Sequence, residues 1–166
     1  VSSLYFSKKQ EKERIFRLFK NAFARNILIV TAAGNSGPGG SSVSKLGDSP
    51  DVICVGCHEG KESHLFQQKC QDCSGRGPGD FVYRKPDIVA PGTEIMSCMG
   101  VRQYVKKSGT SMATPIVSGA LALTAERFPY MSAQEIKRKL IHSADDLGES
   151  FLAQGFGMVN VKRLLQ

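Results

Sequence analysis

The stretch with the clearest chemical potential is Gly109–Pro115, which reads Gly-Thr-Ser-Met-Ala-Thr-Pro. Its small residues predict a tight turn that places Ser111 at the opening of a helix. The first turn of a helix has backbone N–H groups without intrahelical partners and carries the positive end of the helix dipole. Such a place suits a serine nucleophile, because the oxyanion of acyl transfer needs donors already directed at it. The residues alone also fit a plain helix N-cap at Thr110 or Ser111.

Asn35 is a second residue whose side chain could take part in this chemistry. It follows Ala33 and Gly34, at the end of an apolar run, and it precedes Ser-Gly. The side-chain amide of an asparagine can donate a hydrogen bond to an oxyanion. An asparagine in this setting is also typical of an ordinary turn. Residue type alone leaves both interpretations open.

The elements that must position these residues alternate between helix-like and strand-like patterns. Apolar residues at helical spacing predict amphipathic helices, and short runs without alternation predict strands buried on both faces. The chain from 111 to 127 is rich in Ala, Leu, Val and small residues, which predicts a helix buried inside the domain. Alternation of helices with buried strands predicts an α/β fold with a mainly parallel sheet. The expected elements are helices over 10–25, over 111–127 and from Ser132, strands over 27–33, 52–56, within 80–90 and over 94–99, and a turn with a closing strand over 155–161.

Five segments resemble, in their order, the motifs of the subtilase family of serine endopeptidases. The resemblance implies a three-layer, subtilisin-like α/β fold in which residues 1–166 form the C-terminal portion of the catalytic domain. It also implies that Ser111 is the nucleophile, that Asn35 donates to the oxyanion, and that a peptide or protein is the substrate. The segments are Ala32–Gly37, Cys73–Pro78, Lys85–Gly92, Gly109–Pro115 and Gly155–Val161.

The acid and the base of the family's catalytic triad are not recognisable in this sequence. In the family they precede the serine in the order Asp, His, Ser, and His58, His64 and His142 do not stand in the position of the base. Val1–Leu4 resembles the family's substrate-binding strand entered part-way, so we expect the acid and base segments to lie before Val1. The chain alone should then be inactive.

The resemblance also predicts where a peptide would bind and what the chain would associate with. Extended-strand contacts to the peptide are expected along the cleft residues. The alternative function is a catalytically silent, subtilase-like module that holds peptides in the same groove. The expected partners are the missing N-terminal half of the domain or a second copy of the chain. The cleft residues are Ser2, Ser3, Leu4, Ala33 and Gly34.

Two cysteine pairs, Cys54-x-x-Cys57 and Cys70-x-x-Cys73, lie twelve residues apart, which is close to the spacing of a four-cysteine zinc site. The strand pattern disfavours zinc, because Cys54 and Cys57 would face opposite sides of a strand and a free cysteine packs as a small apolar residue. A disulfide such as Cys70–Cys73 is less favoured still. The odd count of five cysteines favours a reducing compartment, whereas the family is often secreted.

Composition restricts the remaining classes of partner. The net charge of +7 is spread along the chain, without the aromatic residues that interleave basic ones in nucleic-acid-binding motifs, so nucleic acid is not an expected partner. No apolar run approaches the roughly 20 residues of a membrane-spanning helix, so no membrane association is expected. The family resemblance implies no required cofactor and allows a bound calcium ion.

Overall fold

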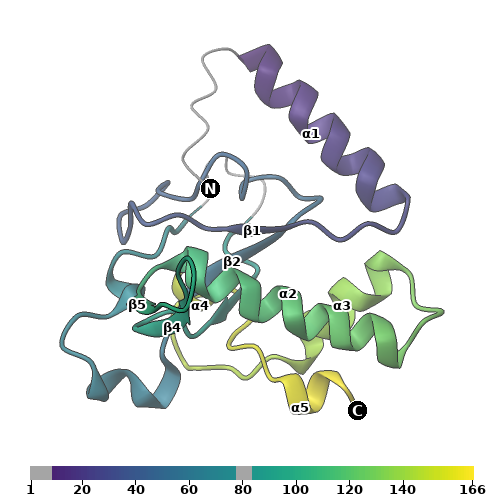
Figure 1. Ribbon diagram of the computed structural model, residues 1–166. Coiled ribbons are helices and arrows are strands. Elements are labelled where there is room, and N and C mark those ends of the chain that lie inside the picture. Colours follow the sequence, from purple (N-terminus) through teal and green to yellow (C-terminus); the bar gives the residue numbers. More distant parts are fainter. Residues whose placement is uncertain (1–8, 78–83) are drawn as a thin grey trace.

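Figure 1 shows a computed structural model of the chain, which describes residues 9–77 and 84–166. At its centre is a parallel sheet of β1 (Val30–Ala32), β2 (Ile53–Cys57) and β3 (Ile88–Ala90), in the order β1-β2-β3. Every residue of β2 and β3 is buried, as the unbroken apolar runs predict. The expected α/β class with a parallel sheet is therefore confirmed.

Helices α1 (Lys9–Ala24), α2 (Thr110–Arg127) and α3 (Ala133–Ser143) agree with the three predicted helices to within one or two residues. Figure 1 shows α2 running across the sheet and α1 standing apart from it. The main core cluster joins buried side chains of β2 and β3 to those of α2 and α3. This packing fixes the start of α2 close to the ends of the parallel strands.

α3 begins with a capping box formed by Ser132 and Glu135. The Ser132 hydroxyl accepts from the Glu135 N–H at 3.3 Å, and the Glu135 carboxylate accepts from the Ser132 N–H at 2.7 Å. The hydrogen bonds from the hydroxyl and the N–H of Ser132 lower the pKa of Glu135. The local sequence therefore specifies where this helix begins.

Several strand predictions need correction. β1 is shorter than the predicted strand and only half-buried. The predicted strand within 80–90 is reduced to β3, and residues 78–83 lie outside the described residues. β4 (Ile95–Cys98) pairs antiparallel with β5 (Tyr104–Lys107), which the sequence did not indicate. The four residues of β5 are mostly polar and exposed, so they lack the apolar pattern of a buried strand.

The C-terminal segment also differs from its prediction. In place of a closing strand over 155–161 there are only isolated bridges, which Met158 makes to Val89 and to Asp145. The short helices α4 (Phe151–Gln154) and α5 (Val161–Leu164) flank this segment. Each has four residues, too few for an apolar period to be recognised.

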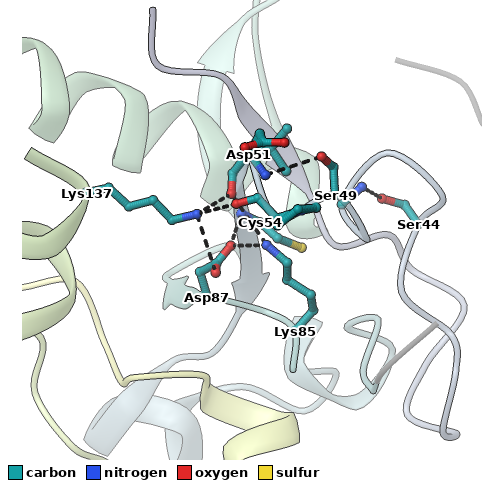
Figure 2. A network of polar contacts seen from close by, with 10 residues as sticks. Ser44, Ser49, Asp51, Cys54, Lys85, Asp87 and Lys137 are labelled. Atoms are coloured by element: carbon teal, nitrogen blue, oxygen red, sulfur yellow. Dashed lines mark hydrogen bonds and ion pairs between the residues drawn. The ribbon is translucent and has the colours of Figure 1, made fainter. Parts of the chain in front are cut away.

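A buried polar network joins β2, the residues before β3, and α3 (Figure 2). The Asp87 carboxylate accepts from the Cys54 N–H and from the Lys85 ammonium, both at 2.7 Å. The Lys137 ammonium donates to the carbonyls of Pro50 and Val52, both at 2.9 Å. Burial lowers the pKa of Lys137 and raises the pKa of the Cys54 thiol to about 12. The motif around Asp87 thus anchors the sheet from inside.

Candidate active site

Ser111 lies at the second position of α2, and it is exposed. The N-cap of α2 is Gly109, which makes no side-chain cap, so neither Thr110 nor Ser111 serves as the N-cap. Gly109 has φ +143°, and a Cβ there would lie 3.1 Å from Asn35 Nδ2. Glycine is required at this position because a side chain would strain the backbone and displace Asn35.

Asn35 is held against the start of α2 by its side-chain oxygen. Its Oδ1 accepts from the Thr110 N–H at 2.9 Å and from the Thr110 hydroxyl at 3.0 Å. The Thr110 hydroxyl in turn accepts from the Gly34 N–H at 3.1 Å, and Thr110 is fully buried. The end of β1 is thereby joined to the beginning of α2.

This arrangement leaves two hydrogen-bond donors unused beside an exposed hydroxyl. No described residue accepts from Asn35 Nδ2 or from the Ser111 N–H, whereas the next amide along, that of Met112, donates to Gly109 at 2.9 Å. Because Oδ1 of Asn35 is already used, its amide group has a fixed orientation. A side-chain amide and a helix N-terminal N–H next to a serine can stabilise an oxyanion.

Thr110 is the residue that sequence reasoning missed at this site. The sequence suggests only the role of an N-cap for Thr110, but the Thr110 side chain bridges Gly34 and Asn35. A threonine buried at the start of a helix, where the helix N-cap is a glycine, has a hydroxyl that needs partners elsewhere. The sequence can therefore indicate that the Thr110 hydroxyl needs hydrogen-bond partners, but it does not identify them.

The predicted cleft residues have different outcomes. Ser2, Ser3 and Leu4 lie outside the described residues. The N–H and C=O groups of Ala33 are bonded to Val55 and Ser44, and the C=O of Gly34 accepts from Gly75. With the Gly34 N–H also donating to Thr110, these two residues can form the wall of a cleft, but they have no free N–H to offer a peptide strand.

The histidines make their contacts away from Ser111. His58 is buried after β2, where its Nδ1 accepts from the Gly60 N–H at 2.9 Å and its Nε2 lies 4.0 Å from Glu149. Burial lowers the pKa of His58. His64 contacts the Lys61 carbonyl, and His142 is exposed on α3. Within residues 9–77 and 84–166, no histidine or carboxylate is hydrogen-bonded to Ser111.

The four cysteines of the proposed zinc spacing are not brought together. Cys57 and Cys70 form a disulfide with a Cα–Cα distance of 5.7 Å. The disulfide suggested from the sequence, Cys70–Cys73, is therefore not formed. Cys54 packs on the opposite face of β2, with Ala33 and Val43. No group of three or more metal-binding side chains occurs in the part of the chain that the structure describes. The same described part has no helix long and apolar enough to cross a lipid bilayer.

Comparison with known proteins places this geometry in a family. Serine protease AprX of Bacillus subtilis (strain 168) is 32% identical over 151 residues, which cover 82% of this chain and 34% of AprX. Subtilisin DY of Bacillus licheniformis is 33% identical over 147 residues, which cover 87% of this chain and 49% of the subtilisin. The chain therefore spans between a third and a half of the length of these relatives.

Comparison of the fold with solved structures indicates the same family. The structure of the self-cleaved protease domain of PatA superposes with a TM-score of 0.74 at 25% identity, over 99% of this chain and 57% of that domain. A solved protease domain thus shares the arrangement of the sheet and helices, which confirms the subtilisin-like fold expected from the motifs. The family model described as the subtilase family matches residues 5–159, and the chain belongs to this family.

Proposed function

We propose that this chain supplies the nucleophile and the oxyanion-stabilising donors of a subtilisin-type serine endopeptidase. The observation that carries the proposal is the fixed Asn35 side chain. Its Oδ1 is bound by Thr110, the residue before the exposed Ser111, and no described residue accepts from its Nδ2. Membership of the subtilase family, whose relatives named above are proteases, supports the same chemistry.

In this proposal the Ser111 hydroxyl attacks the carbonyl carbon of a peptide bond and gives its proton to a general base. The oxyanion that forms accepts hydrogen bonds from Asn35 Nδ2 and from the Ser111 N–H. Collapse of this intermediate expels the amine with the proton from the base and leaves an acyl group on Ser111, which water then hydrolyses. No described histidine contacts Ser111, so the base and its orienting acid come from polypeptide beyond residues 9–77 and 84–166. The 166-residue chain by itself is then inactive.

A fluorophosphonate probe tests this function, because it reacts with a serine that a base has activated. The natural polypeptide that contains these residues should be labelled at Ser111, and Ser111→Ala should abolish the labelling. Ser150→Ala is the matched control, since Ser150 is an exposed serine outside α2 whose side chain makes no helix-cap hydrogen bond. This control should be labelled at the unaltered rate.

Absence of labelling in a folded natural polypeptide would refute the enzymatic proposal. It would favour a catalytically silent module that binds peptides in the same groove. Peptide binding measured by fluorescence anisotropy would then distinguish that module from a protein with no peptide site.

A further inference from the structure

A buried carboxylate outside the proposed catalytic group lies in contact with the backbone that leads to Ser111. Glu59 follows β2 by two residues, and its side chain is buried. One of its oxygens, Oε1, accepts from the N–H groups of Gly92 and Thr93, at 3.0 and 2.8 Å. Successive backbone N–H groups form a concave site that favours an anion. Here a side chain of the same protein occupies that site.

The turn at Gly92 also carries the segment that precedes the serine. The Gly92 carbonyl accepts from the Gly109 N–H at 2.9 Å, and Gly109 is the N-cap of α2. Two further contacts join the same segments, because the Glu94 N–H donates to the Ser108 hydroxyl at 2.9 Å and Ile95 pairs with Lys107. Residues 92–95 and 107–109 are therefore joined into one hydrogen-bonded unit.

Packing at Gly92 allows this unit little freedom. A Cβ at Gly92 would lie 2.6 Å from Cys57 Sγ and 2.8 Å from the Gly109 carbonyl oxygen. The disulfide from Cys57 to Cys70 also lies at this point, and the Cys70 N–H donates to the Thr93 hydroxyl at 2.9 Å. The end of β2, the turn after β3 and the beginning of α2 therefore meet at Gly92.

We infer that Glu59 is a positioning residue for Ser111, which it fixes through the Gly92–Gly109 hydrogen bond. The start of α2 is then held from two sides, by Asn35 through Thr110 and by Glu59 through Gly92. This inference rests on the proposed function of Ser111 and adds a residue to it. Glu59 does not touch the substrate, and its effect is on the placement of the nucleophile.

Loss of the Glu59 carboxylate should lower kcat more than it changes KM. Glu59→Ala leaves two buried N–H groups without an acceptor, so the turn shifts and Gly109 shifts with it. A displacement of about 1 Å at a reacting group can cost about 100-fold in rate. We expect kcat to fall about 10- to 100-fold with KM within about twofold. Glu59→Gln retains one acceptor oxygen and should recover part of the rate.

Gln154→Ala is the matched control. Gln154 is also buried and also holds a loop, since its Oε1 accepts from the Leu147 N–H at 2.7 Å and its Nε2 donates to the Glu149 carbonyl at 2.8 Å. None of its hydrogen-bond partners lies in the turn at Gly92 or in the start of α2. This variant should lose stability while its kcat remains unchanged. An equal fall in kcat for Gln154→Ala and Glu59→Ala would show a general loss of stability and overturn the inference.

Amide hydrogen exchange of the same natural polypeptide provides a readout that needs no activity. Glu59→Ala should raise the exchange rate of the Gly109 N–H by about tenfold or more, and Gln154→Ala should not. Unchanged exchange at Gly109 in Glu59→Ala would overturn the inference. If the unaltered protein is not labelled at Ser111, the proposed function fails, but the exchange measurement still decides the role of Glu59.

Discussion

Asn35→Asp separates the two halves of the Asn35 side chain, because the proposed function gives each half a different task. An aspartate retains an oxygen that can accept from the N–H and the hydroxyl of Thr110, at the 2.9 and 3.0 Å seen for asparagine. The same substitution replaces Nδ2, which donates to no described residue, by the second oxygen of a negatively charged carboxylate. The contact to α2 is kept and the donor to the oxyanion is lost.

The expected magnitude follows from this separation. Loss of one oxyanion donor costs about 10²–10³ in kcat, which corresponds to about 2.7–4 kcal/mol in the transition state. The added charge faces a developing oxyanion and makes the loss larger. Stability should change little, because the retained oxygen still accepts from both Thr110 donors and the new charge is exposed to solvent. Asn35→Ala should lose the same catalytic donor and also leave two buried donor groups of Thr110 without their acceptor, at about 1–3 kcal/mol each.

The assay combines kcat and KM for a peptide substrate with urea denaturation of each variant, using the natural polypeptide. Thr110→Ser is the control, because it keeps the hydroxyl that contacts Asn35 and Gly34. It should retain most of the activity. The reasoning is refuted if Asn35→Asp keeps kcat within about threefold of the unaltered protein, or if it loses as much stability as Asn35→Ala.

Three further predictions follow from the rest of the structure. Removing the disulfide with Cys57→Ala and Cys70→Ala should lower the free energy of unfolding by about 3 kcal/mol, measured by urea denaturation, because the bond closes a loop with a sequence separation of 13. His58 has a pKa below its ordinary 6.5 in the folded state, so the unfolded state binds more protons as the pH falls below 6.5. Stability should therefore fall with decreasing pH in that window, and His58→Asn, which retains an acceptor for Gly60, should abolish the dependence in chemical denaturation at each pH. Ala122→Lys, on the exposed side of α2, should leave the stability of the 166-residue chain within about 0.5 kcal/mol but should reduce proteolytic activity of the natural polypeptide, where we expect that side to be covered.

Local sequence predicted the features that depend on a few neighbouring residues. The capping box at Ser132 needs only residues three apart, and the turn at Gly109 needs only small residues before a helix. The strand pattern around Cys54 also predicted correctly that Cys54 and Cys57 face opposite sides of β2. In each case, the deciding interaction lies within one element.

Features that depend on contacts between distant segments were not predictable in this way. The pairing of Cys57 with Cys70 depends on how the loop after β2 folds back, and cysteine spacing leaves the partner undetermined. Glu59 reaches the turn at Gly92, 33 positions further along the chain, and nothing in its own surroundings in the sequence indicates that partner. Thr110 and Asn35 meet across 75 positions. The family resemblance identified Asn35 but gave no information about what holds its amide in place.

The exposed surfaces of α2 and β1 bear on where the catalytic base of Ser111 lies. The sequence of α2 has no polar face, which predicts burial on every side, yet one side is exposed in the described structure. β1 is half-buried although its residues are those of an internal strand. These uncovered surfaces lie on the same elements that carry Ser111 and lead to Asn35, and Ser111 has no described base. A further layer of polypeptide packed on α2 and β1 would bury these surfaces, and it would also be close enough to bring an imidazole to the Ser111 hydroxyl. The small, uncharged residues over most of that helix face are therefore an independent, physical reason to look for the base in the polypeptide that covers it. The exposed residues of this face are Ser111, Pro115, Ser118, Gly119, Ala122 and Ala125, with the charged Glu126 at its C-terminal end.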